Sequence, residues 1–172
     1  MPRFAMAVTA NRFRIPSKLL AHCFAHGRET YPREACGVLS GPAASPGAIS
    51  KAHRIANILD ALHRRDPEHF RRTARTGYVL DPSGYLTVER ALEARGHRIK
   101  AVYHTHVDVG AYFSAEDRKR ALWDGKPIFA GVFFLVCAVK NGEPDGAVIA
   151  YFDEEHRAFT EVRLNEQGRP LP

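Results

Sequence analysis

The chain has no long hydrophobic run, few cysteines and no internal repeat. No apolar segment approaches the roughly 18 residues that a membrane-spanning helix needs, so we expect no membrane association. Residues 1–16 carry arginine and asparagine between their apolar residues. This pattern disfavours a secretory signal.

Cysteine is scarce as well as odd in number. The three cysteines, Cys23, Cys36 and Cys137, each stand among apolar residues. A disulfide framework needs an even and denser set in an oxidising compartment. We therefore expect reduced thiols and a cytoplasmic protein.

The length limits the possible folds. The chain has 172 residues, of which 45% are hydrophobic and 26% charged, an ordinary globular composition. A domain has about 100–200 residues, so residues 1–172 are expected to form a single domain. A parallel (β/α)₈ barrel, which needs about 250 residues, is disfavoured.

Basic residues exceed acidic ones by 25 to 19, giving a net charge of +6. Part of this excess gathers within 59–76, a stretch that contains Arg71 and Arg72. Few aromatic residues interleave with it, and no nucleic-acid-binding motif is present. We therefore expect a solvated loop or contact with an acidic protein partner, and no nucleic acid.

Periodicity and turn residues predict a mixture of helices and short strands. The expected helices start at Ser17, Asp81 and Ser114, each as N-cap, and end before Pro32, at Gly96 and at Trp123. Expected strands lie within 4–15 and at 35–41, 49–58, 77–80, 99–104, 130–139, 147–152 and 157–164.

The order of these elements predicts the fold class. The stretch 59–76 is expected to be a mobile loop or an irregular helix, and Asn141-Gly142 marks a hairpin. A strand-rich second half fits an α/β (α+β) fold with a mixed, largely antiparallel sheet flanked by helices. It fits a doubly wound parallel sheet less well.

One apolar strand ends in two closely spaced histidines, His104 and His106. Alternate residues of a strand point to the same face, so the two imidazoles lie side by side, as a metal site requires. The same pattern also occurs at polar strand ends that bind no metal.

A hydroxyl and a carboxylate follow this pair. Asp117 stands eleven residues after His106, where a loop can return it as a third ligand. Two histidines, an aspartate and an open fourth position are the pattern of a catalytic zinc site. Ser114 and Asp117 also have the spacing of a helix capping box, and a helix start can serve both purposes.

Glu34 precedes the predicted buried strand 35–41, about seventy residues before the histidines. A glutamate at that position can reach a site formed at the end of a neighbouring strand, and there act as a general base. Taken alone, it would be interpreted as a solvated surface residue.

Together these residues resemble the signature of the JAMM (MPN-plus) metalloprotease family. That signature is a glutamate before an apolar, glycine-containing strand, then H-x-H-P, six residues, serine, two residues and aspartate. The matching positions here are Glu34, His104, His106, Ser114 and Asp117. The one departure is Val107 in place of proline, which we expect to alter the following loop and not the metal site. The resemblance covers about residues 15–150.

The resemblance implies a fold and a role for each residue. The fold is the cytidine-deaminase-like JAMM/MPN fold. His104, His106 and Asp117 are expected to bind one Zn²⁺ per chain. Glu34 is expected to move a proton from water to the leaving amine. Ser114 is expected to donate a hydrogen bond to the oxyanion.

Other zinc and thiol chemistries fit less well. The H-x-E and P-C-x-x-C motifs of zinc deaminases and the H-E-x-x-H motif are missing from the sequence. Cys36 remains an alternative as a nucleophile or as a fourth zinc ligand, but a cysteine beside Gly37 in an apolar strand is typical of a core residue.

The resemblance also implies a substrate class. The leading hypothesis is an isopeptidase or peptidase that cleaves after the glycine-ended tail of a ubiquitin-like protein. E1- and E2-like enzymes of the same pathway, as in bacterial antiphage systems, are then the expected partners. The alternatives are a peptidase that frees an amino acid such as cysteine from a sulfur-carrier protein, and a non-catalytic zinc-binding scaffold.

Overall fold

This computed structural model describes residues 14–171. The strand expected within residues 4–15 therefore falls largely outside the described residues. Within the described range, no helix is both long and apolar enough to cross a bilayer.

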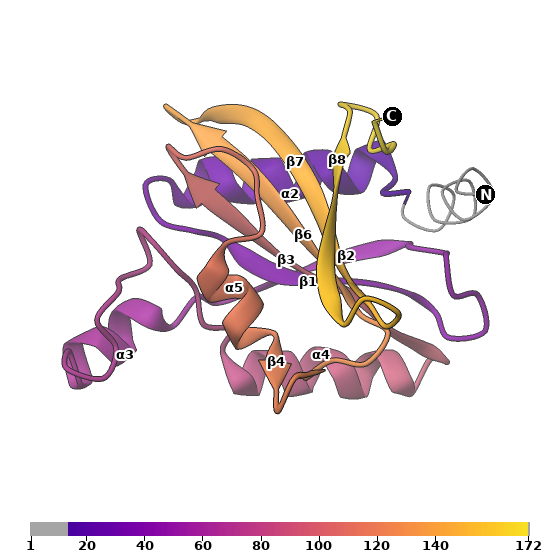
Figure 1. The fold of residues 1–172 in the computed structure, drawn as a ribbon, viewed down its shortest axis with the longest axis horizontal. Helices are drawn as coiled ribbons and strands as arrows, with labels where there is room; N and C mark the ends of the chain where they lie inside the picture. Colours follow the sequence, from indigo (N-terminus) through magenta and orange to yellow (C-terminus); the bar gives the residue numbers. More distant parts are fainter. Residues whose placement is uncertain (1–13, 172) are drawn as a thin grey trace.

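A six-stranded sheet organises the described residues (Figure 1). The strands lie in the order β2-β1-β3-β6-β7-β8. Their bounds are β1 Cys36–Pro42, β2 Lys51–Ile55, β3 His97–Val107, β6 Phe133–Lys140, β7 Glu143–Asp153 and β8 Ala158–Leu164. The pair β3–β6 is parallel and the other pairs are antiparallel. The mixed, largely antiparallel sheet predicted from the element order is confirmed.

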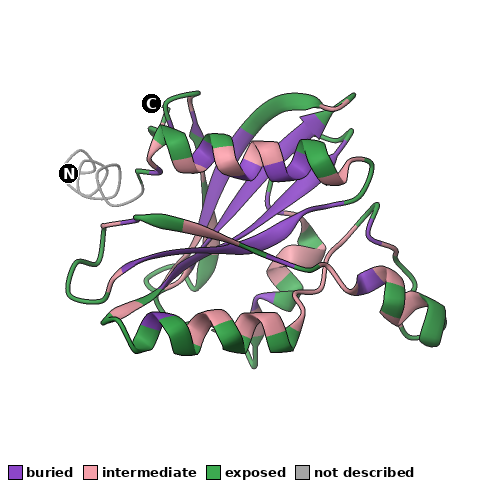
Figure 2. Ribbon diagram, turned by 180° about the vertical axis from the view of Figure 1, so that it is seen from behind, coloured by how far each residue is buried: buried purple, intermediate pink, exposed green. Residues whose placement is uncertain are grey.

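Helices cover both faces of this sheet. Helix α2 (Ser17–Thr30) packs on one face, as the view from behind in Figure 2 shows, while α4 (Pro82–Glu93) and α5 (Ala115–Arg120) lie on the other. The short helix α3 (Leu59–Arg65) stands at one side of the molecule. A small hairpin, β4 (Leu122–Trp123) and β5 (Lys126–Pro127), follows α5.

The alternation of β3 divides the interior into two cores. Tyr103 belongs to the core under α2, whereas Val102 belongs to the core under α4 and α5. Thr105 also faces α2, because a Cβ on Gly27 of that helix would lie 2.7 Å from its methyl group. His104 and His106 therefore face the opposite side, which carries α5.

Three local predictions were wrong. Pro16, not Ser17, is the N-cap of α2, and no side chain caps that helix. The segment 77–80 forms no strand and contributes one isolated bridge, Asn57 with Leu80. Helix α5 ends at Arg120, because Asp124 and Gly125 adopt positive φ values (49° and 69°) and turn the chain into the β4–β5 hairpin.

Candidate metal centre

The end of β3 places two imidazoles in the protein interior. His104 has no exposed surface and His106 is 5% exposed. Their Nε2 atoms are 3.2 Å apart. The Oδ2 atom of Asp117 lies 3.5 Å from Nε2 of His104 and 3.6 Å from Nε2 of His106. Three potential metal-binding atoms therefore form a nearly equilateral triangle.

This triangle has the size that a tetrahedral zinc ion requires. Nitrogen and oxygen ligands about 2.0–2.1 Å from zinc are about 3.4 Å from each other in a tetrahedron. The three measured separations, 3.2, 3.5 and 3.6 Å, lie around that value. Two imidazoles and one carboxylate also form a donor set that leaves a fourth position open, so the residues fit Zn²⁺.

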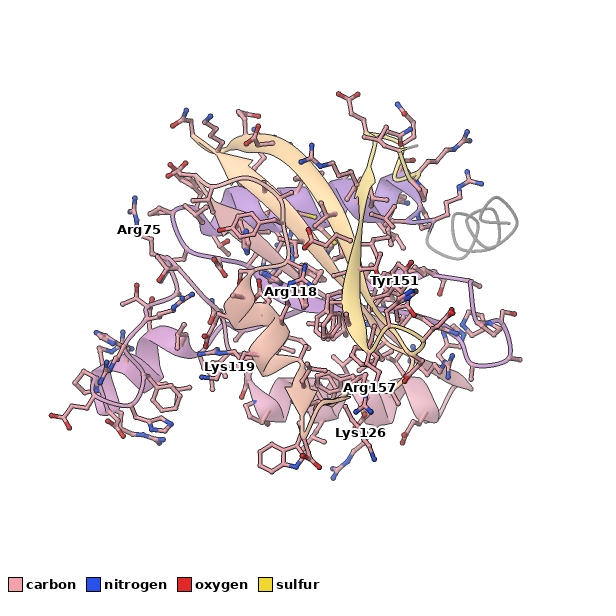
Figure 3. The ribbon with its side chains drawn as sticks, in the orientation of Figure 1. Arg75, Arg118, Lys119, Lys126, Tyr151 and Arg157 are labelled. Atoms are coloured by element: carbon pink, nitrogen blue, oxygen red, sulfur yellow. The ribbon has the colours of Figure 1, made fainter. Side chains whose placement is uncertain are left out.

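Helix α5 positions Asp117 although it has only six residues. Ser114 and Asp117 form the expected capping box: the Asp117 amide donates to Ser114 Oγ, and the Ser114 amide donates to Asp117 Oδ2. The Arg118 side chain (Figure 3) donates hydrogen bonds to the Glu161 carboxylate and to the Phe159 carbonyl, and so links α5 to β8. Arg120 donates to the carbonyl of Tyr78 at 3.0 Å.

The protonation states suit metal binding. Burial lowers the pKa of His104, which favours the neutral imidazole that can act as a ligand. Burial alone would raise the pKa of Asp117. The His104 and His106 imidazoles beside the carboxylate outweigh this effect and hold the pKa of Asp117 well below its usual range. The site thus favours a neutral His104 and an ionised Asp117.

Neighbouring groups orient the two rings differently. His106 Nδ1 lies 3.2 Å from the carbonyl oxygen of Gly110, an acceptor that fixes the ring and its tautomer. Among the described residues, Nδ1 of His104 has no hydrogen-bond partner. Tyr78 instead stacks on the His104 ring at 4.4 Å with an interplanar angle of 21°. On the Nδ1 side, therefore, His104 is held by packing and His106 by a hydrogen bond.

Sheet pairing brings Glu34 to the same place. Cys36 pairs with His104 in the antiparallel β1–β3 ladder, so the register places Glu34 opposite His106. Two hydrogen bonds extend this pairing, since the Ala35 amide donates to Thr105 Oγ1 (2.8 Å) and the Thr105 amide donates to the Ala35 carbonyl (3.0 Å). Asn57 Nδ2 donates to the Glu34 carbonyl at 3.0 Å.

Glu34 lines an open cleft of about 410 Å³ together with His106, Ser114 and Asp117. Its side chain is almost buried, and burial together with the charge of Asp117 raises its pKa to about 9. A positive ion held by Asp117 would lower the pKa of Glu34. The cleft thus combines the potential metal ligands with a carboxyl group that can exchange a proton.

The Ser114 hydroxyl lies at the same cleft but is engaged with Asp117. Its Oγ donates to Asp117 Oδ2 at 2.6 Å while accepting from the Asp117 amide. The expected role as an oxyanion donor therefore requires this hydrogen to turn away from the carboxylate.

Val107 extends β3 where the JAMM signature has proline. Val107 pairs with Val139 in the parallel ladder, and the next amide, of Asp108, donates to the Val139 carbonyl. Asp108 then takes a positive φ of 58° and accepts hydrogen bonds from the Tyr31 hydroxyl and the Asn141 amide. The loop after β3 is tied in this way to α2 and to the β6–β7 hairpin.

Cys36 does not join the metal-binding atoms. Its thiol donates to the Ile55 carbonyl, and burial raises its pKa to about 12. A thiol that resists ionisation is a poor nucleophile and a poor zinc ligand. All three cysteines are buried and form no disulfide among the described residues.

Residues 16–149 match the family described as prokaryotic homologs of the JAB domain. The chain belongs to this family. The match covers the segments that carry Glu34, both histidines, Ser114 and Asp117. It confirms the resemblance inferred from the signature, and the chain is a hydrolase of the JAMM type.

Two relatives of this JAB-family chain are similar to it over much of their length. A desampylase from Haloferax volcanii is 28% identical over 148 residues, which is 84% of this chain and 89% of the relative. A CysO-cysteine peptidase from Mycobacterium bovis is 34% identical over 107 residues, covering 62% and 64% of the two chains.

Solved structures agree with the JAB-family fold. A protein from Desulfitobacterium hafniense superimposes with a TM-score of 0.62 at 19% identity, covering 85% of this chain and 86% of the other. A protein from Salinibacter ruber gives a TM-score of 0.56 at 27% identity, with 86% of each chain covered.

Several residues that shape the site carried no signal that sequence reasoning could use. Tyr78, Thr105 and Asp108 act through contacts with partners far away in the chain. Asn57, at the end of the predicted strand 49–58, likewise acts on distant partners. Its side chain joins Glu34 to the carbonyl of Gly77.

Proposed function

We propose that this chain is a zinc-dependent peptidase that cleaves at the C-terminal tail of a ubiquitin-like or sulfur-carrier protein. The observation that carries the proposal is the triangle of His104, His106 and Asp117 beside a nearly buried Glu34 in an open cleft. The names of the relatives, a desampylase and a CysO-cysteine peptidase, support the substrate class.

In this proposal each side chain has one task. His104, His106 and Asp117 would hold one Zn²⁺, which supplies Lewis acidity and lowers the pKa of a water molecule to about 7. Glu34 takes a proton from the attacking water and later delivers it to the leaving nitrogen.

The Ser114 hydroxyl has a separate task in the proposal, which is to stabilise charge on the carbonyl oxygen under attack. It would release Asp117 and donate its hydrogen bond to that oxygen. Its position at the N-cap of α5, directly before the helix that carries Asp117, keeps it within the cleft.

Two variants of the function differ in the bond that is cut. A deconjugase cuts an isopeptide bond formed by E1- and E2-like enzymes, as in antiphage conjugation systems. An amino-acid-releasing peptidase frees a residue such as cysteine from a sulfur carrier. For both we propose that residues 1–172 act as one domain in the cytoplasm, where free thiols such as Cys23, Cys36 and Cys137 stay reduced.

The proposal is tested with a carrier protein that ends in Gly-Gly and is extended either by one amino acid or by a lysine isopeptide. Cleavage after the second glycine is followed by mass spectrometry with the purified protein, after chelation and after addition of zinc. We expect cleavage that chelation abolishes and zinc restores. Cleavage that is unaffected by complete metal removal would overturn it.

A further inference from the structure

The cleft of the candidate metal centre contains three arginines, Arg72, Arg75 and Arg120. Arg120 is occupied: it pairs with Glu116 at 2.8 Å and donates to the carbonyl of Tyr78. Within residues 14–171, Arg72 and Arg75 have no carboxylate within 4.0 Å, and Arg72 donates one hydrogen bond, to the Thr76 carbonyl at 3.2 Å, which leaves its other N–H groups for a ligand. Two cationic side chains of this cleft are therefore available to a ligand.

The loop between α3 and α4, residues 66–81, holds these two arginines in a defined place. Ala74 lies between them and is 2% exposed. Its amide donates to Asp60 Oδ1 at 2.7 Å, and its carbonyl accepts from the Glu34 amide at 2.6 Å. Arg72 and Arg75 thus flank a residue whose backbone is bonded directly to that of the proposed proton carrier.

The two guanidinium groups reach different parts of the cleft. The charge of Arg72 acts on Glu34, where it opposes the rise in pKa caused by burial. The charge of Arg75 acts on Asp108 and Tyr31, beside the loop that follows β3. Figure 3 shows the Arg75 side chain extending from its loop into solvent. Arg72 therefore places positive charge near Glu34, and Arg75 places it at the mouth of the cleft.

We propose that Arg72 and Arg75 form a carboxylate-binding site that selects substrates carrying a negative charge close to the scissile bond. The inference rests on the proposed function, because the ligand is part of the peptidase substrate. Guanidinium groups bind carboxylates through parallel N–H···O bonds, and in the cleft such a bond would orient the tail beside Glu34.

The carboxylate can come from two places in a substrate tail. An amino acid attached to the terminal glycine has a free α-carboxylate, whose oxygens are three bonds from the scissile nitrogen. A glutamate or aspartate in the residues before the glycines supplies the same chemistry from the other side of the bond. The first source fits release of an amino acid, and the second fits deconjugation.

Four carrier probes separate these sources. The carrier ends in Gly-Gly-Ala, with the final alanine as free acid or as amide, and has either glutamate or glutamine among the six residues before the glycines. The values of kcat and KM are measured for the wild-type enzyme and the double variant Arg72→Gln, Arg75→Gln. Binding of each probe is measured in the Glu34→Gln background, which needs no turnover.

We expect the double variant to raise KM about tenfold or more on the probe that carries both carboxylates, since a charge-assisted hydrogen bond corresponds to at least that factor. Any change in kcat should be the same on all four probes, because it would come from the loss of the Arg72 charge beside Glu34. If wild type prefers acid over amide and the variant does not, the α-carboxylate is the ligand. If wild type prefers glutamate over glutamine and the variant does not, the tail side chain is the ligand.

Arg71→Gln is the matched control, because Arg71 stands on the same loop but does not line the cleft and donates to the Glu68 carbonyl. Its KM should equal that of wild type. Arg72→Lys with Arg75→Lys keeps the charge and should lie between wild type and the glutamine variant. Melting temperatures show that each variant is folded.

The outcomes separate this inference from the proposed function. If wild type cleaves the probes and the Arg72→Gln, Arg75→Gln variant keeps its KM on all four, the carboxylate site is wrong and the peptidase stands. If wild type cleaves none but binds charged probes through these arginines, the site stands and the peptidase is wrong. Absence of both cleavage and charge-dependent binding overturns the two together.

Discussion

The two walls of the cleft are built in different ways. One wall consists of β3 and α5, whose three potential ligand atoms are 3.2–3.6 Å apart and largely buried. The other wall is the segment 71–77, which belongs to no helix or strand of the described chain and carries Arg72 and Arg75. Hydrogen bonding between paired strands fixes side-chain positions as closely as a metal site requires. In a loop, side chains can be substituted without disturbing that strand pairing.

The largest effect is expected on the first wall. His106→Ala removes one of the three proposed ligands, so zinc content should fall to a small fraction and hydrolysis should stop. Elemental analysis of protein purified without added metal measures this. His156→Ala is the control, since His156 is exposed and pairs with the carboxylate of Asp153, away from the cleft. A full complement of zinc in His106→Ala would show that the triangle is not the metal site.

Glu34 lies between the two walls, because its backbone bonds to Ala74 while its side chain lines the cleft beside His106. A substitution of the side chain leaves these backbone hydrogen bonds in place. Glu34→Gln should keep zinc and the fold but lower kcat by about 10²–10⁴, the usual contribution of a general acid–base group. Zinc content, melting temperature and kcat are measured on the same sample. Turnover close to wild type in Glu34→Gln would remove Glu34 from the chemistry.

Ser114→Ala is expected to have a smaller effect on rate, a loss of about 10²–10³ in kcat if the hydroxyl supports the oxyanion. The same change removes the N-cap of α5, worth about 0.5–2 kcal/mol. Ser114→Thr, which keeps the hydroxyl and the cap, should recover most of both. If stability falls in Ser114→Ala while kcat does not, the serine serves the helix alone.

Thr105→Val tests the bond that holds Glu34 beside the histidines. It leaves the buried Ala35 amide without its side-chain acceptor, at a cost of about 1–3 kcal/mol in unfolding free energy. Urea denaturation of the metal-free protein measures the change. Thr105→Ser retains the hydroxyl and should restore most of the stability; equal losses in both variants would point to packing against α2 instead.

The smallest effect is expected on the second wall. Asp60→Ala removes the acceptor of the Ala74 amide and loosens the loop. It should raise KM for charged tails by about fivefold, the equivalent of one ordinary hydrogen bond, with zinc content unchanged. A loss of zinc in Asp60→Ala would show that the two walls are not independent.

The sequence by itself determined the elements with strong local patterns. The buried strand after Glu34, the helix capped by Asp81 and the Asn141-Gly142 hairpin follow from periodicity and turn chemistry, and the structure has all three. The alternation of His104 and His106 and the capping box of Ser114 and Asp117 are likewise local. These features can be predicted from the sequence because they depend on residues that are close together in the chain.

The tertiary structure decided which distant groups meet. Pairing of β1 with β3 brings Glu34 opposite His106, and folding of the 66–81 loop brings Arg72 to the same cleft. Tyr78 stacks on His104, and Asp108 accepts from Tyr31, across separations that periodicity does not describe. These contacts depend on strand register and on packing of the whole sheet, so residue types and their spacing could not specify them.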